Sequence, residues 1–201
     1  MLDGGARRLI DPALDRLGAG LARAGIGADQ VTYAGFAIGL AAAAAIALEL
    51  YLVGLALILL SRLCDGLDGA VARHTATTDR GGFLDIVLDF AFYGAIPLGF
   101  VIADPAANAI AGATLLVSFY VNGASFLAFA IFAEKRKLAT EARGSKSLYF
   151  TTGLAEATET IVVFCLFCLL PWAFVPLAYL FAALTFVTAI ARIVLAVRAF
   201  R

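Results

Sequence analysis

The chain has 201 residues, of which 63% are hydrophobic and only 15% are charged, and its 15 basic and 15 acidic residues cancel to a formal charge of zero. Soluble domains are normally about 45–50% apolar and about 25% charged, so a soluble or a disordered protein is excluded. A nucleic-acid partner is excluded as well, because such proteins need a basic surface. The composition predicts an all-α integral membrane protein, in which each charge inside a span is costly.

Residues 1–28 are predicted to form a juxtamembrane amphipathic helix that lies on the membrane surface. Asp11 followed by Pro12 is typical of a helix start, with Asp as the N-cap and Pro at the first helical position. Apolar residues then recur at helical spacing, and the Gly25-Ile26-Gly27 stretch is expected to end the helix.

Residues 29–201 are predicted to form a core of six transmembrane helices, which makes one domain with the preceding segment. Each span needs about 20 apolar residues. The expected spans run from Val31 to Leu48, from Tyr51 past Leu63 to Ala72, from Gly81 or Gly82 to Ala103, from Ala107 to Ala133, from Thr152 to Leu170 and from Val175 to Leu195.

The basic residues indicate how these spans are oriented. All 15 fall in the N-terminal segment, in the second-to-third and fourth-to-fifth connections with their flanks, or near the C-terminus. The opposite connections, near Glu49, Asp104 and Pro171, hold none. Positive charge stays on the cytoplasmic side, so both termini are expected to face the cytoplasm of what we predict to be a bacterial inner membrane.

Four aspartates are gathered where the second and third predicted spans meet. The stretch reads Asp65-x2-Asp68-Gly69-x2-Ala72-Arg73 and, after seven further residues, Gly81-x3-Asp85-x3-Asp89. Residues three or four positions apart share one face of a helix, so each half presents its aspartates on one side. The two helices are expected to be neighbours in an antiparallel hairpin, with the carboxylates facing each other at the cytoplasmic end.

Four carboxylates this close need compensating positive charge, and Arg73 alone is insufficient. Oxygen ligands without His or Cys favour Mg²⁺, Mn²⁺ or Ca²⁺. Four of them suit a pair of metal ions, the arrangement that serves phosphoryl transfer. The alternative explanation is a set of solvated helix-end charges. It fits Asp85 and Asp89 poorly, because both lie in an apolar run, where an acid indicates function.

The pattern resembles the signature of the CDP-alcohol phosphotransferase family, which is DxxDGxxAR, a short spacer and GxxxDxxxD, and all eight fixed positions are present. A second similar segment runs from Asp29 to Gly35, with Thr32 and Gly35 at matching positions; the family usually has Pro-Asn where this chain has Ala28-Asp29. The family core has a surface helix and six spans, so the resemblance covers most of the chain. Uncharacterised bacterial inner-membrane members are the most similar.

The resemblance implies transfer of a phosphoalkyl group from a CDP-linked donor to an alcohol, with release of CMP. It assigns Asp65, Asp68, Asp85 and Asp89 to two divalent metal ions, Mg²⁺ or Mn²⁺. It also makes Asp89 the general base that takes the proton of the acceptor hydroxyl. CDP-binding roles are implied for Thr32, Asp29, Gly69, Ala72, Arg73 and Gly81.

The donor implied by the six-span core is CDP-diacylglycerol, while the acceptor, a small polar alcohol, stays open. Phe90 follows Asp89, where glycerol 3-phosphate-using members usually have Lys, and the later Gly94 and Pro97 look more like the serine and inositol branches. Candidate acceptor contacts are Arg143, Lys146, Glu156, Glu159 and Arg192. Each has a simpler explanation. Arg143 and Lys146 can serve only to orient the protein in the membrane, and the two glutamates can stabilise a helix start through the helix dipole. Arg192 can extend its charged end to the lipid headgroups.

A cation transporter or channel is the alternative function, because intramembrane acids also mark ion paths. It is disfavoured because the acids lie at one end of the predicted bundle, and because the Gly/Ala/Arg pattern would be unnecessary. A catalytically lapsed member is disfavoured by the intact signature. Members of the family are commonly dimers, so a homodimer is expected.

Overall fold

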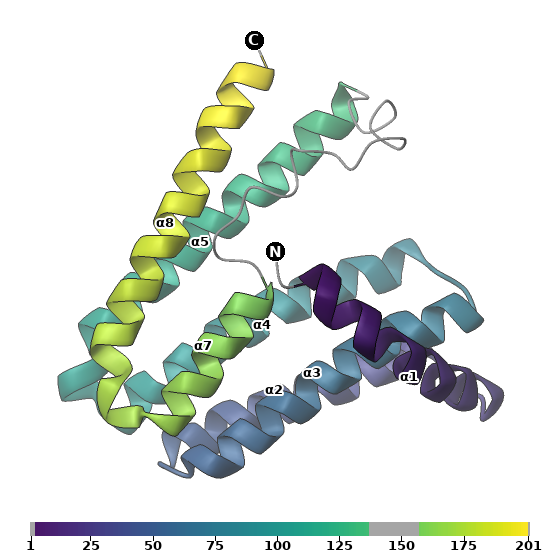
Figure 1. Ribbon diagram of the computed structural model, residues 1–201, viewed down its shortest axis with the longest axis horizontal. Helices are drawn as coiled ribbons and strands as arrows, with labels where there is room; N and C mark the ends of the chain where they lie inside the picture. The colour runs from purple at the N-terminus through teal and green to yellow at the C-terminus, as the bar shows by residue number, and fades with distance from the viewer. Residues whose placement is uncertain (1–2, 137–156, 201) are drawn as a thin grey trace.

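The computed structural model describes residues 3–136 and 157–200, and side chains from residue 12 onward within these ranges. All regular structure in this part of the chain is helical, as the apolar runs predict (Figure 1). The helices are α1 (Asp3–Arg23), α2 (Ala28–Ala47), α3 (Tyr51–His74), α4 (Asp79–Ala103), α5 (Pro105–Lys135), α7 (Ala157–Leu169), the short 3₁₀ helix η1 (Pro171–Ala173) and α8 (Phe174–Ala199).

Four helical segments are long and apolar enough to cross a membrane. They are α2, α4, α5 and the run from η1 through α8. Helix α3 has 24 residues, but its apolar run is interrupted by Arg62, Asp65 and Asp68. Helix α7 has 13 residues in the described part, and residues 152–156 of the predicted fifth span lie outside it. Helices therefore occupy all six predicted positions, and the crossing of the membrane by all six stays a prediction.

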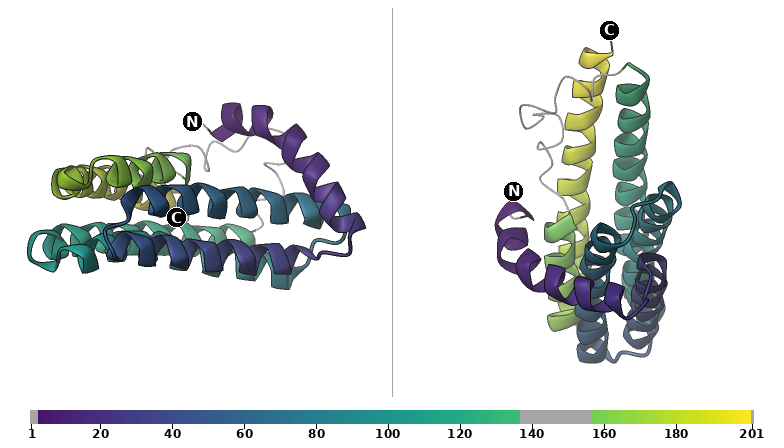
Figure 2. Two further views of the ribbon diagram at one scale, coloured as in Figure 1. Left: turned by 90° about the horizontal axis from the view of Figure 1, so that it is seen from below. Right: turned by 90° about the vertical axis from the view of Figure 1, so that its right-hand side faces the viewer.

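The predicted start of the first helix is wrong. Helix α1 begins at Asp3 and contains Pro12 in its interior. A proline inside a helix removes one backbone hydrogen bond and bends the helix, and α1 changes direction along its length (Figure 2). The predicted end is confirmed: Gly25 has a φ of +80°, and the Ile26 N–H donates to the Leu21 carbonyl at 3.1 Å, as in a Schellman cap.

Helix α2 is the centre of the N-terminal half, because it packs along both α3 and α4. At Gly35, a Cβ would lie 2.8 Å from Cys64 Cβ, so the missing side chain is what allows α2 and α3 to approach. The buried Ser61 hydroxyl donates to the Gly35 carbonyl at 2.7 Å. This bond fixes the rotation of α3 about its own axis at Ser61. The charged side chains of α3 begin at the next residue, Arg62.

The other helices pack on this unit. Helix α1 lies against α3, with Leu14 buried. Helix α5 runs beside α8 and also contacts α4 (Figures 1 and 2). Phenylalanines join α4, α7 and the start of α8: the Phe174 ring stacks on that of Phe100 with centroids 4.9 Å apart and meets that of Phe167 edge-on with centroids 4.8 Å apart. This aromatic core lies toward the end of the bundle away from the aspartates.

The contact between α4 and α2 provides a test of this packing. A Cβ added at Gly99 would lie 2.7 Å from the Ala43 carbonyl oxygen, a backbone atom that cannot move alone. We expect Gly99→Ala to cost about 1–3 kcal/mol, as overpacking does, and to lower the thermal unfolding midpoint in detergent by about 2–4 °C per kcal/mol. Gly94→Ala, on the same helix, is the matched control because nothing lies within 4 Å of its added Cβ. Equal midpoints for the two variants would contradict the close approach.

Candidate active site

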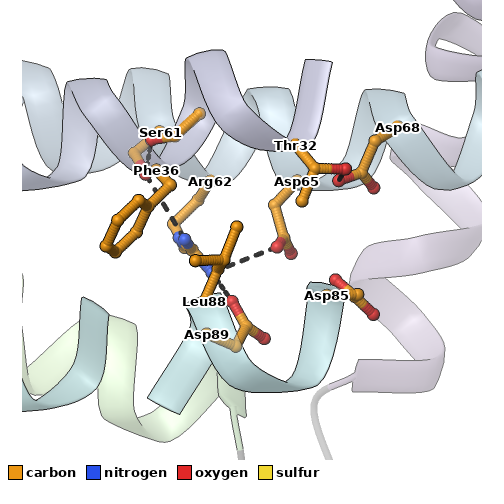
Figure 3. Close-up of a pocket in the computed structure, with 10 residues that line it drawn as sticks. Thr32, Phe36, Ser61, Arg62, Asp65, Asp68, Asp85, Leu88 and Asp89 are labelled. Atoms are coloured by element: carbon orange, nitrogen blue, oxygen red, sulfur yellow. Dashed lines mark hydrogen bonds and ion pairs between the residues drawn. The ribbon is translucent and has the colours of Figure 1, made fainter. Parts of the chain in front are cut away.

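Three of the four signature aspartates come together between α3 and α4. One carboxylate oxygen from each of Asp65, Asp68 and Asp85 lies within 4.8 Å of the other two. Figure 3 shows Asp65 and Asp68 projecting from α3, with Asp85 reaching up from α4. The pocket is lined by these three residues together with Thr32, Gly35, Phe36, Ser61, Arg62, Leu88 and Asp89.

The two helices that carry the aspartates are held by a third helix. Both α3 and α4 pack along α2, whereas direct contacts between α3 and α4 are few among the described residues. The predicted meeting of the carboxylates is confirmed for three of them, but the close hairpin packing is not. The chain reverses between the helices, and the Thr78 hydroxyl caps α4 by accepting from the Gly81 N–H at 3.0 Å. The acidic pocket therefore lies between α3 and α4.

Thr32, on the first turns of α2, is joined directly to the acidic cluster. Its hydroxyl donates to Asp68 Oδ2 at 2.6 Å, and Asp68 is buried, with only 7% of its surface exposed. Thr32, for which the resemblance implies a CDP-binding role, thus lies beside the signature aspartates. A hydroxyl bound to one oxygen of Asp68 orients the carboxylate and leaves its other oxygen available to a ligand.

Asp89 is paired with Arg62, one of the basic residues that in the sequence serve only to indicate orientation. Arg62 Nη1 donates to Asp89 Oδ1 at 2.6 Å and lies 3.4 Å from Asp65 Oδ1. The signature does not identify Arg62 as a site residue, because Arg62 precedes its first aspartate by three positions. The signal that would have found it is the rule applied to the aspartates, since a charge inside an apolar run indicates a functional site.

The residues implied in CDP binding divide into two groups. Asp29 lies beside α4, with Oδ2 3.4 Å from Arg80 Nε and Oδ1 3.5 Å from the position of an added Gly81 Cβ. Arg73, on the last turn of α3, is exposed and lies 3.5 Å from Asp15 of α1. Gly69 and Ala72 occupy the same last turns of α3, next to the carboxylates.

Of the acceptor candidates, Arg143, Lys146 and Glu156 lie outside the described residues. Glu159 is in the first turn of α7. Arg192 of α8 donates to the Asn122 side chain at 2.8 Å and to the Ser125 hydroxyl at 3.0 Å, both on α5. Neither Glu159 nor Arg192 is among the described residues that line the acidic pocket. The hydrogen bonds of Arg192 instead join α8 to α5.

The residues present fit a divalent metal ion. The cluster offers three carboxylate oxygens that lie within 4.8 Å of one another, close enough to bind the same ion. Mg²⁺ and Mn²⁺ prefer such hard oxygen ligands. Four carboxylates face one guanidinium in this pocket, so the pocket retains an excess of negative charge that a cation would neutralise.

The fold and the site agree with those of the protein family and the known proteins that this chain resembles. Residues 25–197 match the profile of the CDP-alcohol phosphatidyltransferase family. The inner membrane protein YnjF of Escherichia coli (strain K12) is 47% identical over 193 residues, covering 96% of this chain and 94% of YnjF. An archaetidylinositol phosphate synthase of Methanothermobacter thermautotrophicus is 42% identical over 94 residues, or 46% of this chain and 45% of that protein.

Solved structures share the fold. The phosphatidylinositol phosphate synthase of Mycobacterium tuberculosis with CDP-DAG bound superposes with a TM-score of 0.60 at 24% identity, covering 92% of this chain and 90% of that one. The same enzyme in complex with manganese and citrate gives a TM-score of 0.58 at 23% identity, covering 92% and 86% of the two chains. With the signature and the profile match, these findings show that the chain is an integral membrane protein and a transferase of the CDP-alcohol phosphatidyltransferase family.

Proposed function

We propose that the protein transfers a phosphatidyl group from CDP-diacylglycerol to the hydroxyl of a small polar alcohol and releases CMP. The observation that carries this proposal is the convergence of Asp65, Asp68 and Asp85 within 4.8 Å, because carboxylates so arranged bind the cations that a pyrophosphate donor needs. The donor is supported by the CDP-DAG-bound structure of a protein with the same fold.

The four signature aspartates are proposed to hold two divalent ions, Mg²⁺ or Mn²⁺. When bound, such ions neutralise phosphate charge and polarise the phosphoryl oxygens. The manganese-bound structure of the related synthase supports this choice of metal. Thr32 contributes by orienting Asp68 through the 2.6 Å hydrogen bond.

Asp89 is proposed as the general base. The acceptor oxygen attacks the β-phosphorus of the donor, the new O–P bond forms as the bond to CMP breaks, and the hydroxyl proton passes to the carboxylate. Asp89 Oδ1 is occupied by Arg62 in this structure, so Oδ2 is the oxygen that would take the proton. Asp29, Gly69, Ala72, Arg73 and Gly81 are proposed to surround the nucleotide, with Arg73 leaving Asp15 to offset phosphate charge.

The site is proposed to open at the cytoplasmic face of a bacterial inner membrane. The aspartates lie at the end of the bundle where α1 joins α2 and α3 joins α4. These connections are flanked by Arg23, Arg73 and Arg80, whereas the turn between α2 and α3 carries no Lys or Arg. Six spans with both termini on the cytoplasmic side, and a homodimer, are parts of the same proposal.

An acceptor screen tests the function. Purified protein with CDP-diacylglycerol and Mg²⁺ or Mn²⁺ is offered myo-inositol phosphate, serine, glycerol 3-phosphate, inositol or choline, and CMP is measured. We expect metal-dependent CMP release with one acceptor, and a polyol phosphate is the first candidate because of the archaetidylinositol phosphate synthase relative. No CMP with any acceptor, combined with ion flux in liposomes, would favour the transporter alternative.

A further inference from the structure

The Arg62–Asp89 ion pair divides the four signature carboxylates into two unequal groups. Asp65, Asp68 and Asp85 present oxygens within 4.8 Å of one another. Asp89 is outside that group, and its Oδ1 accepts from Arg62 at 2.6 Å. The same guanidinium nitrogen lies 3.4 Å from Asp65 Oδ1. Figure 3 shows both contacts, so one positive charge lies between the carboxylates of Asp65 and Asp89.

Arg62 is held in this position by more than the ion pair. Its Nη2 donates to the Ser61 hydroxyl at 3.3 Å, and its Cζ lies 3.9 Å from the centroid of the Phe92 ring. Phe92 is completely buried, and Ser61 is itself fixed to α2. Only 16% of the Arg62 side chain is exposed, so the guanidinium cannot leave Asp89 simply by swinging into solvent.

A metal ion and this guanidinium compete for Asp89. Mg²⁺ binds a carboxylate oxygen at about 2.0–2.1 Å, whereas Arg62 already lies within hydrogen-bond distance of Asp89 Oδ1. Two cations on one partly buried carboxylate repel each other more strongly than they would in water. The three-carboxylate group can bind an ion while Arg62 stays in place, but an ion on Asp89 has to share that carboxylate with the guanidinium or displace it.

We propose that Arg62 is a positioning residue that makes the two metal sites unequal. The first ion would be held by Asp65, Asp68 and Asp85, and a second ion would bind Asp89 more weakly because the guanidinium competes for that carboxylate. This inference rests on the proposed function, because it presupposes that the signature aspartates bind metal. It adds a residue outside the signature that controls how the second site fills.

Mn²⁺ binding to the metal-stripped full-length protein in detergent tests the proposal without any turnover. Electron paramagnetic resonance of free Mn²⁺ during a titration gives the number of ions and both affinities. We expect one tight and one weaker site in the wild type. In Arg62→Gln the second dissociation constant should fall by about tenfold or more, because a positive charge no longer competes for Asp89. Arg62→Lys keeps the charge and should retain the inequality.

Two controls make the effect specific. Arg198→Gln removes an equal charge from the exposed last turn of α8 and should leave both affinities unchanged. In the Asp89→Asn background, Arg62→Gln should no longer tighten a second ion, because the ligand it releases is gone. If Arg62→Gln fails to fold, by thermal unfolding, Arg62→Met carries the test, because it also removes the charge and fills a similar volume beside Phe92.

The outcomes separate the inference from the function on which it rests. Two equal sites in the wild type, or unchanged second affinity in Arg62→Gln, would overturn the role of Arg62 while leaving the metal site standing. A tightening that persists in the Asp89→Asn background would also overturn it, since the effect would then be a general change of charge. A wild type that binds no Mn²⁺ would instead overturn the metal site itself.

Discussion

Asp68→Asn is expected to lower metal-dependent CMP release by about 10³-fold, since metal stabilisation of the transition state amounts to several kcal/mol. Asp68 is the most deeply buried residue of the three-carboxylate group, and its oxygens lie within reach of those of Asp65 and Asp85. Asn has the same shape and can still accept from Thr32, so the packing around the site should survive. Turnover with CDP-diacylglycerol at saturating Mg²⁺, together with Mn²⁺ binding, is the measurement.

The matched control for this prediction is Asp79→Asn. Asp79 is an exposed acid in the first turn of α4, where it interacts favourably with the helix dipole. It does not line the acidic pocket formed by the described residues. Removing its charge should change activity little. Asp68→Asn with more than a tenth of wild-type turnover, or an equal loss in both variants, would contradict a metal-binding role for Asp68.

Asp89→Asn is expected to lower turnover by about 10²–10⁴-fold, the usual contribution of a general base, while CDP-diacylglycerol binding is largely retained. The reason is that Asp65, Asp68 and Asp85 remain together without it. Single-turnover CMP release and equilibrium binding of the labelled donor in mixed micelles measure the two quantities separately. An Asp89→Asn protein that turns over like the wild type would remove Asp89 from the role of base.

The Arg62–Asp89 pair requires a stability control for this second prediction. Removing one partner of a fully buried pair costs about 3–5 kcal/mol, because the other charge is left uncompensated, and this part-buried pair is expected to cost less. The thermal unfolding midpoint of Asp89→Asn must therefore be measured beside its activity. Donor binding and stability that fall together would indicate a structural defect, whereas lost turnover with donor binding intact supports a role in proton transfer.

The helices could be located from the sequence because their signal is local. The second predicted span begins at Tyr51, and so does α3; the third ends at Ala103, and so does α4. An apolar run between polar connections is sufficient for such a prediction. Pro12 shows where the local rule fails, since α1 continues through a residue that usually begins or breaks a helix, and the packing of α1 on α3 is a contact between distant parts of the chain.

The partners of charged side chains could not be predicted in the same way. Arg192 was expected either to contact an acceptor or to snorkel, and the structure places it against Asn122 and Ser125, some 70 residues earlier in the chain. Arg62 and Asp89 are 27 residues apart on different helices. Which side chains meet depends on the rotation and separation of helices packed on α2, and hydrophobic periodicity does not specify either.

The sequence by itself determined that this is an all-helical membrane protein of the CDP-alcohol phosphatidyltransferase family, because composition and an eight-position signature do not depend on packing. It also identified four aspartates as candidate metal ligands. Only the tertiary structure decided how those four are arranged. Three present oxygens within 4.8 Å of one another while Asp89 is bound by Arg62, because α2 holds α3 and α4 far enough apart for a guanidinium to lie between them.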